Sequence, residues 1–319
     1  MTATMSQPAG GRALGVTVRP MIEADLDEAD RVMRLAFGTF LGLPEPMAFA
    51  GDGDYVRGRW AATPGAALTA ELDGRVVGSN FATRWGSSGF FGPLTVHPSL
   101  WDRGVGRSLM TSTMQVMDGW GLTNAGLFTF AHSPKHLGLY QRYGFAPRFL
   151  TAVLSAPVGE TGHRDGWSTF SADPDQAGRL ASCAALTDAI YPGLDVSSEI
   201  RACHRLRLGD TVLLDDGSGF AVCHAGPGTE AATGVCLIKF GAARPADPGA
   251  LARLLSACEA FAAAHGAHRL VAGVSMARRQ AYGMLTERGY RADLIGVTMH
   301  RPDQPGYHRA DAMVIDDWR

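Results

Sequence analysis

Residues 95–108 read TVHPSLWDRGVGRS, and they stand where an apolar run typical of a strand gives way to a helix-like pattern. Gly104 and Gly106 lie one residue apart, between Arg103 and Arg107. Each glycine would lower the stability of a helix by about 1 kcal/mol relative to alanine, so we expect the two glycines to serve a structural or binding role. A helix that begins after a strand presents amides without internal partners, and glycines let an anion approach them closely. The stretch therefore predicts a phosphate-binding turn; the alternative is a tight strand-to-helix turn that binds nothing.

Strand-like and helix-like segments alternate on both sides of this turn. Apolar residues either recur at helical spacing or form short apolar runs, and Asp73-Gly74 is a pair favoured in two-residue hairpin turns. We expect strands at 16–20, 90–96, 125–130 and 152–156, a hairpin at 67–85, and helices at 24–40, 107–120 and 134–143.

The same order of segments recurs further along the chain. RSLMTSTMQVMDGWG (107–121) aligns without gaps on ARLLSACEAFAAAHG (252–266), an offset of 145 residues, and the same offset relates Gly144 to Gly289. We therefore predict two copies of one fold that arose by duplication. We expect a flexible tail at 1–15, a first domain at 16–157, a linker at 158–167 and a second domain at 168–319.

Composition narrows the class of protein. The formal net charge of the 319 residues is −2, which gives no case for binding nucleic acid or an anionic membrane. No apolar run approaches 18 residues and the first residues lack the apolar core of a signal peptide, so we expect a cytoplasmic protein. The five cysteines form no C-x-x-C pair, and neighbouring Cys and His residues on a strand point to opposite faces. We therefore expect reduced thiols and no metal.

The order of segments, together with V-H-P (96–98), R-G-V-G-R (103–107) and GLYQRYGFAPRF (138–149), resembles the GNAT superfamily of N-acetyltransferases, which use acetyl-CoA. The string HSPKHLGLYQRYGF (132–145) resembles a two-domain bacterial subgroup in particular. Trp101 stands where the family's turn usually has Gln or Arg, and Ser133 stands where an Asn is often found. The resemblance implies an α/β class with two tandem GNAT folds, each a central mixed β-sheet flanked by helices. The family segment L-Y-x-x-x-G-F matches at Leu139, Tyr140, Gly144 and Phe145.

The resemblance also implies how acetyl-CoA would bind. The strand before the turn would splay from its neighbour, and the acetyl thioester would lie between the strand of Thr95 and the strand of Thr129. The implied cofactor-binding residues are Leu94, Thr95, Val96, Arg103, Gly104, Val105, Gly106, Arg107, Ser108 and Ser133.

The implied reaction is direct attack of a primary amine on the thioester. The leaving thiolate needs an acid; a tyrosine with a pKa of about 10 is protonated at neutral pH, and Tyr140 occupies the family's acid position. A lysine-like amine must lose a proton at a cost of roughly 4.6 kcal/mol at pH 7, so a general base is expected. The sequence leaves that base open among His97, which also precedes Pro98 in a turn, His132 and His136. Acidic residues at 52–54 and 316–317 and the terminal carboxylate are further options.

The second copy lacks these chemical positions. The 145-residue offset places Leu251 opposite Gly106 and Leu285 opposite Tyr140, so we predict a degenerate second copy with one working site in 16–157. We expect an N-acetyltransferase for a small-molecule amine. The alternatives are a non-catalytic acyl-CoA binding or sensing protein, or an acyltransferase for another acyl-CoA. A homodimer is also left open.

Overall fold

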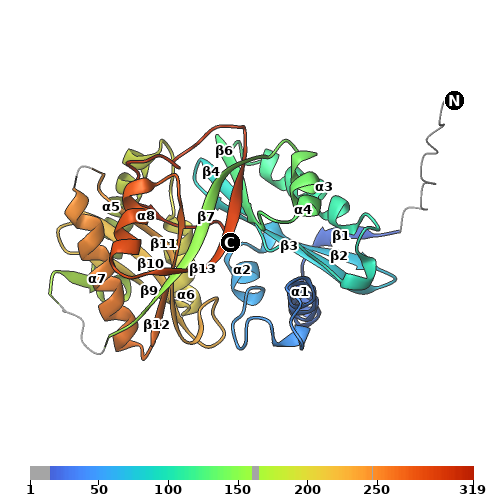
Figure 1. Ribbon diagram of the computed structural model, residues 1–319, viewed down its shortest axis with the longest axis horizontal. Helices are drawn as coiled ribbons and strands as arrows, with labels where there is room; N and C mark the ends of the chain where they lie inside the picture. The colour runs from blue at the N-terminus through green and yellow to red at the C-terminus, as the bar shows by residue number, and fades with distance from the viewer. Residues whose placement is uncertain (1–14, 160–164, 246) are drawn as a thin grey trace.

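One mixed β-sheet runs through the whole molecule, flanked by helices (Figure 1). The computed structural model describes residues 15–159, 165–245 and 247–319. Residues 1–14 of the predicted tail and 160–164 of the predicted linker lie outside this description. The sheet has 14 strands, of which twelve follow the order β1-β2-β3-β4-β6-β13-β7-β12-β11-β10-β9-β8, while β5 pairs with β3 and β14 with β11.

The first copy supplies eleven elements. They are β1 (Thr17–Pro20), α1 (Leu26–Phe40), α2 (Arg57–Ala62), β2 (Ala67–Leu72), β3 (Arg75–Trp85), β4 (Ser88–Phe91), β5 (Thr95–Val96), α3 (Val105–Asp118), β6 (Asn124–Thr129), α4 (Pro134–Gln141) and β7 (Ala146–Pro157).

The second copy supplies a similar series. It comprises β8 (Trp167–Thr169), α5 (Gln176–Ile190), α6 (Ser197–Leu206), β9 (Gly209–Leu214), β10 (Gly219–Gly226), β11 (Ala232–Ala243), α7 (Pro248–Ala264), β12 (Arg269–Ser275), α8 (Arg279–Glu287), β13 (Arg291–Arg301) and β14 (Val314–Ile315).

The predicted repeat of the fold is confirmed by the element bounds. Adding 145 to the bounds of β6 gives 269–274, and β12 spans Arg269–Ser275. The same shift of α4 gives 279–286, and α8 spans Arg279–Glu287. Apolar residues at helical spacing bury one face of each matching helix. In α3 the buried apolar residues are Val105, Leu109, Met110, Met114 and Met117.

The hairpin of β2 and β3 turns at Asp73 and Gly74, as the sequence predicts. Both residues have positive φ angles, 50° and 75°, which is the backbone that a two-residue hairpin turn requires. The predicted strand at 90–96 is instead two strands, because the chain bends between β4 and β5 at Gly92 (φ 148°). This bend separates β5 from β6, the strand that β4 pairs with in parallel.

The two copies exchange their last strands. β13 of the second copy lies between β6 and β7 of the first, with Val297 opposite Thr129. β7 in turn pairs with β12 of the second copy, with Leu154 opposite Ala272. Figure 1 shows β7 and β13 side by side where the two halves of the molecule meet. The halves therefore share one continuous sheet.

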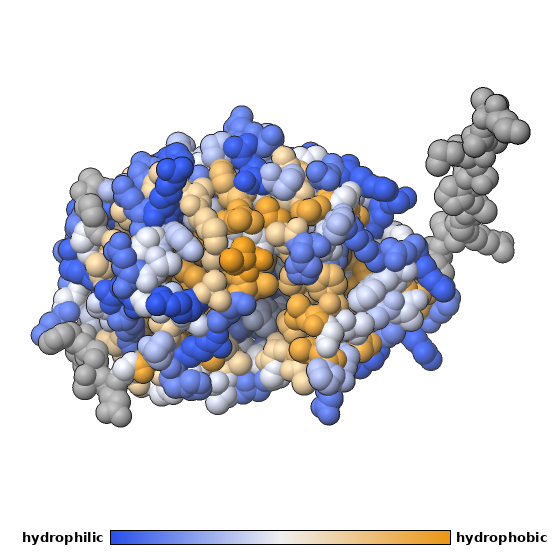
Figure 2. Space-filling model, in the orientation of Figure 1, coloured by the Kyte–Doolittle hydropathy of each residue, from blue (hydrophilic) through white to orange (hydrophobic). Residues whose placement is uncertain are grey.

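The surface, the cysteines and the helices add three observations. Figure 2 shows apolar side chains gathered near the middle of one face, with hydrophilic side chains around its rim. All five cysteines are buried free thiols. Within the described ranges, no helix has the length and apolar character needed to cross a lipid bilayer.

Candidate active site

The strands β4 and β6 diverge at the centre of the first copy. They pair in parallel from Ser88 to Phe90, opposite Asn124 to Gly126. Beyond the bend, β5 pairs only with β3 on its other side, with Thr95 opposite Ser79. The splay expected from the sequence is therefore present, and we call the gap between residues 94–96 and the end of β6 the first wedge.

The turn after β5 leads to a helix start that is open to a ligand. Gly104 precedes α3 with φ 89°, a backbone region that disfavours any residue with a Cβ. Among the described residues, no side chain caps the first turn of α3. A Cβ placed on Gly106 would lie 3.7–3.9 Å from the side chains of Leu139, Val96 and Leu94. These are ordinary contact distances, so a methyl group would fit at Gly106 but a larger side chain would enter the space beside the helix start, where an anion is favoured.

Two adjoining cavities surround this turn. The wedge cavity, about 350 Å³, extends from the turn along the first wedge to α1. The turn cavity, about 380 Å³, lies between the starts of α3 and α4. Both are lined by Asp102, Gly104, Gly106, Lys135, His136 and Leu139. The wedge cavity is also lined by Ala36, Phe37, Phe40, Leu94, Thr95, Val96, Leu100, Trp101, Val105, Phe130 and Ser133.

Trp101 and Asp102 shape the turn in place of the family's usual residue. The indole N–H of Trp101 donates to the carbonyl oxygen of Val96 at 2.8 Å, which ties the turn to the end of β5. The Lys135 ammonium lies 5.3 Å from the centre of the Trp101 ring and forms an ion pair of 2.8 Å with Asp102. The side chain that departs from the family pattern therefore holds the turn against α4.

The remaining predicted cofactor residues divide into two groups. Arg107 lines the turn cavity together with Arg142, which sequence reasoning missed, and both add positive charge there. Arg103 is exposed, and Ser108 faces the turn, its hydroxyl 3.5 Å from the carbonyl oxygen of Gly104. Ser133 caps α4 itself, accepting from the amide of His136 at 3.4 Å. The geometry thus brings most of the predicted residues together but not Arg103.

Tyr140 lies in the core beside the first wedge. It is 7% exposed, and its ring packs 5.7 Å from that of Phe91. Burial raises the pKa of the Tyr140 phenol above its ordinary value, and a side-chain hydrogen bond with Thr129, at the end of β6, opposes the rise. The phenol is therefore protonated at neutral pH and reaches Thr129 on one of the two wedge strands, although Tyr140 itself lines neither cavity.

The three candidate histidines have different surroundings. His97 shapes the turn before α3, where its Nδ1 lies 2.8 Å from the Ser99 hydroxyl. His132 is exposed and stacks on Phe40. His136 is half-buried and lines both cavities. Burial lowers the pKa of His136, and the charges of Lys135 and His132 lower it further.

The acidic options for a base are engaged elsewhere. Asp52 accepts from the amide and hydroxyl of Thr233, and Asp54 accepts from two backbone amides at the start of α2. Asp316 pairs with Arg278, and Asp317 pairs with Arg319.

Aromatic residues that sequence reasoning missed cover the wedge cavity. Phe37 and Phe40 of α1 face Phe130, with ring centres 6.3 Å and 4.7 Å away. The signal was their spacing of three residues on the helix face that also carries Ala36. They make one wall of the cavity apolar.

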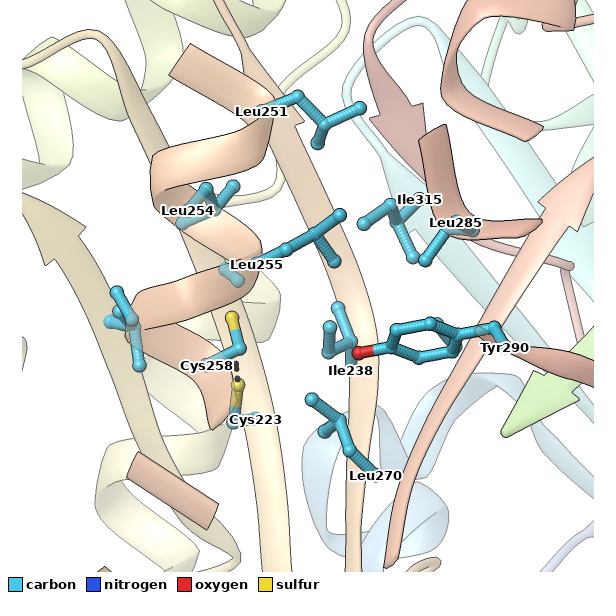
Figure 3. Close-up of a cluster of buried hydrophobic side chains, with 14 of the residues drawn as sticks. Cys223, Ile238, Leu251, Leu254, Leu255, Cys258, Leu270, Leu285, Tyr290 and Ile315 are labelled. Carbon is cyan, nitrogen blue, oxygen red and sulfur yellow. Dashed lines mark hydrogen bonds between the residues drawn. The ribbon is translucent and has the colours of Figure 1, made fainter. Parts of the chain in front are cut away.

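The equivalent region of the second copy is closed. The Asp247 carboxylate caps α7, accepting from the amides of Gly249 and Ala250 at 3.0 and 3.2 Å. β11 and β12 also separate, and we call the gap between them the second wedge. β14 pairs with β11 beyond this point, so the chain's own backbone fills the gap. Figure 3 shows Ile315 of β14 beside Leu285, the residue at the position that corresponds to Tyr140.

Comparisons with known proteins agree with this geometry. Residues 34–145 match the family described as the acetyltransferase (GNAT) family. No curated protein matches the chain.

Solved structures share the fold across both copies. A proposed acetyltransferase from Pyrococcus horikoshii has a TM-score of 0.68 at 14% identity, with 98% of each chain covered. A GCN5-related N-acetyltransferase from Sphaerobacter thermophilus has a TM-score of 0.57 at 16% identity, covering 91% of this chain and 96% of that one. A tandem GNAT protein from the clavulanic acid biosynthesis pathway has a TM-score of 0.54 at 13% identity, covering 89% and 98%. The predicted tandem GNAT fold is confirmed.

Proposed function

We propose that this chain, which has two GNAT folds in tandem and matches the acetyltransferase (GNAT) family over residues 34–145, acetylates a primary amine of a small molecule in its first copy. Acetyl-CoA is the cosubstrate of the family. One observation carries the proposal: the start of α3, with Gly104 and Gly106, opens onto the first wedge and two adjoining cavities. The proposed domain bounds are 16–157 for the working copy and 168–319 for the second, with a linker between them.

The residues around the turn would hold the cosubstrate, which supplies the acyl group as an activated thioester. The backbone at the start of α3 would bind its diphosphate, with Arg107 and Arg142 contributing charge. The edge of residues 94–96 that faces away from β3 has no strand partner within the described ranges, and it would bind the amides of the pantetheine arm.

Tyr140 is the proposed general acid. Its raised pKa keeps the proton on the phenol oxygen at neutral pH, as a group that protonates a leaving thiolate requires. Thr129 fixes the hydroxyl at the wedge strand β6. The phenol would reach the reacting sulfur at the wedge itself.

His136 is the proposed general base. It lines both cavities, and its lowered pKa leaves the imidazole neutral at pH 7 and able to accept a proton from an amine. His97 and His132 remain weaker candidates because one is bonded within its turn and the other is exposed.

A small-molecule acceptor fits the wedge cavity better than a polycation. Phe37, Phe40 and Phe130 form its wall, and its one carboxylate, that of Asp102, is paired with Lys135 among the described residues. The cytoplasmic location and the homodimer stay predictions.

A second candidate function is acyl-CoA binding without catalysis. Its support is the packing of Tyr140 within the core against Phe91 and Phe145, away from the cavity linings. In that case the tyrosine would stabilise the fold and take no part in proton transfer.

Turnover separates the two candidates. Purified protein is mixed with acetyl-CoA and a panel of small primary amines, and release of free CoA is followed. We expect turnover with at least one amine and a loss of 100-fold or more in kcat for Tyr140→Phe, within the range for a general acid. Tyr191→Phe is the matched control, because its hydroxyl bonds Thr123 away from both cavities. Binding of acetyl-CoA with no turnover by any amine would favour the sensing function.

A further inference from the structure

The bend that opens the first wedge is held by one buried guanidinium. Arg59 of α2 is 8% exposed, and its Nη1 donates to the carbonyl oxygen of Gly92. The amide of Gly92 donates to the carbonyl oxygen of Phe81 on β3 at 2.8 Å. Both polar groups of Gly92 are thus fixed at the point where the chain leaves β6.

The second copy in turn holds Arg59. Glu230, in the segment between β10 and β11, accepts from Nε and Nη2 of Arg59, each at 2.8 Å. Lys239 of β11 donates to the same carboxylate at 2.8 Å, and the carbonyl oxygen of Arg319 accepts from both Arg59 and Lys239. We call Arg59, Glu230 and Lys239 the cross-copy bridge.

The bridge depends on each of its charges. Burial alone would raise the pKa of Glu230, but Arg59 and Lys239 together hold it below its ordinary value. Removing one member of a buried ion pair leaves its partner's charge uncompensated. The buried His224 of β10 lies near Glu230, and both line a cavity of about 40 Å³ between the copies.

We propose that Arg59 is a positioning residue for the first wedge, and that the second copy sets the opening of the cosubstrate site through Glu230 and Lys239. This inference rests on the proposed function, since it concerns the same site. The fork of Arg59 joins two partners that lie on different copies, Gly92 on the first and Glu230 on the second. A change in the bridge therefore moves the bend, and the backbone edge at 94–96 that follows it.

The test uses the full chain, with coenzyme A as the probe. Binding is measured by calorimetry for Glu230→Gln and Arg59→Lys, and amide exchange at Gly92 is followed by mass spectrometry. We expect the CoA dissociation constant to rise tenfold or more in both variants, with faster exchange in the peptide that contains Gly92. Arg59→Lys keeps the charge but loses the planar fork that bonds the Glu230 carboxylate twice while a third N–H reaches Gly92, so it separates geometry from charge.

Glu259→Gln is the matched control, because it breaks an ion pair with Arg288 within the second copy, away from the bend. We expect its CoA affinity to stay within twofold of the parent protein. A merely stabilising bridge would lower the unfolding temperature of Glu230→Gln and leave both CoA affinity and Gly92 exchange unchanged, which overturns the proposal. Faster exchange with unchanged affinity also overturns it. If the parent protein binds no CoA, the proposed function fails, whereas unchanged exchange in both variants refutes the bridge separately.

Discussion

The two wedges of this molecule share a fold and differ in what occupies them. In the first, the start of α3 lacks a side-chain cap among the described residues, and β5 has one strand edge without a strand partner there. In the second, Asp247 caps α7 and β14 covers the corresponding edge of β11. Both solutions obey the same requirement, that backbone polar groups find partners. In the first copy a ligand would supply these hydrogen-bond partners, whereas in the second copy Asp247 and β14 supply them.

The comparison also shows how little sequence change is needed to close such a site. Gly106 corresponds to Leu251, and Tyr140 to Leu285, both fully buried apolar residues in the second copy. Gly273 of β12 leaves room for the closing segment, because a Cβ there would lie 2.0 Å from the Asp317 side chain. The framework of strands and helices persists while the binding groups are replaced.

The largest effect is expected where the second wedge is held shut. Arg278 and Asp316 form a fully buried ion pair of 2.9 Å, and Tyr307 donates to the same carboxylate at 2.8 Å. Arg278→Met should lower the free energy of unfolding by about 3–5 kcal/mol, because Asp316 loses its compensating charge. Urea unfolding measures this.

The control for that variant is Arg253→Met, which removes exposed ion pairs with Asp216 and Asp247 and should leave the urea midpoint nearly unchanged, because solvent screens these charges. Equal losses in the two variants would contradict the larger contribution expected of the buried pair.

The second largest effect is expected from substitutions at Gly106 and Leu251, the corresponding residues that distinguish the two turns. Gly106→Leu should weaken CoA binding 100-fold or more, about 2.7 kcal/mol, because the side chain enters the space between Leu139, Val96 and Leu94. The reverse change, Leu251→Gly, should create no new CoA site, since β14 still fills the second wedge. Calorimetry measures both, with Gln115→Leu on the exposed face of α3 as the control. Normal binding by Gly106→Leu would refute the turn as the diphosphate site.

The smallest effect concerns the pH dependence of the first copy. If His136 is the base, activity falls as pH drops through its pKa, which lies below the usual 6.5 of histidine. Lys135→Met removes one of the positive charges that lower this pKa, so the acidic limb of kcat/KM should move to higher pH. An acidic limb of kcat/KM that does not move in Lys135→Met would show that His136 is not the base. The same conclusion would follow if His136→Gln kept that limb.

Sequence reasoning was most successful where local chemistry determines structure. The hairpin at Asp73-Gly74, the helix start at Gly104 and the repeat each follow from short-range patterns. The exchange of β7 and β13 could not be predicted, because both are apolar strands and nothing local states which neighbour each will choose. Arg59 was missed for a similar reason: it meets Glu230 across 171 residues of sequence, and an arginine on a short helix looks like a solvated one.

The strand exchange has a consequence for how the protein is made. Val297 of β13 faces Thr129 of β6 although the two residues lie far apart in the sequence, so the second edge of β6 cannot pair until translation has passed β13. Until then the nascent chain carries an unprotected strand edge of the kind that invites aggregation. Contacts this distant also slow folding. The first copy therefore completes its sheet only after the second copy has been synthesised.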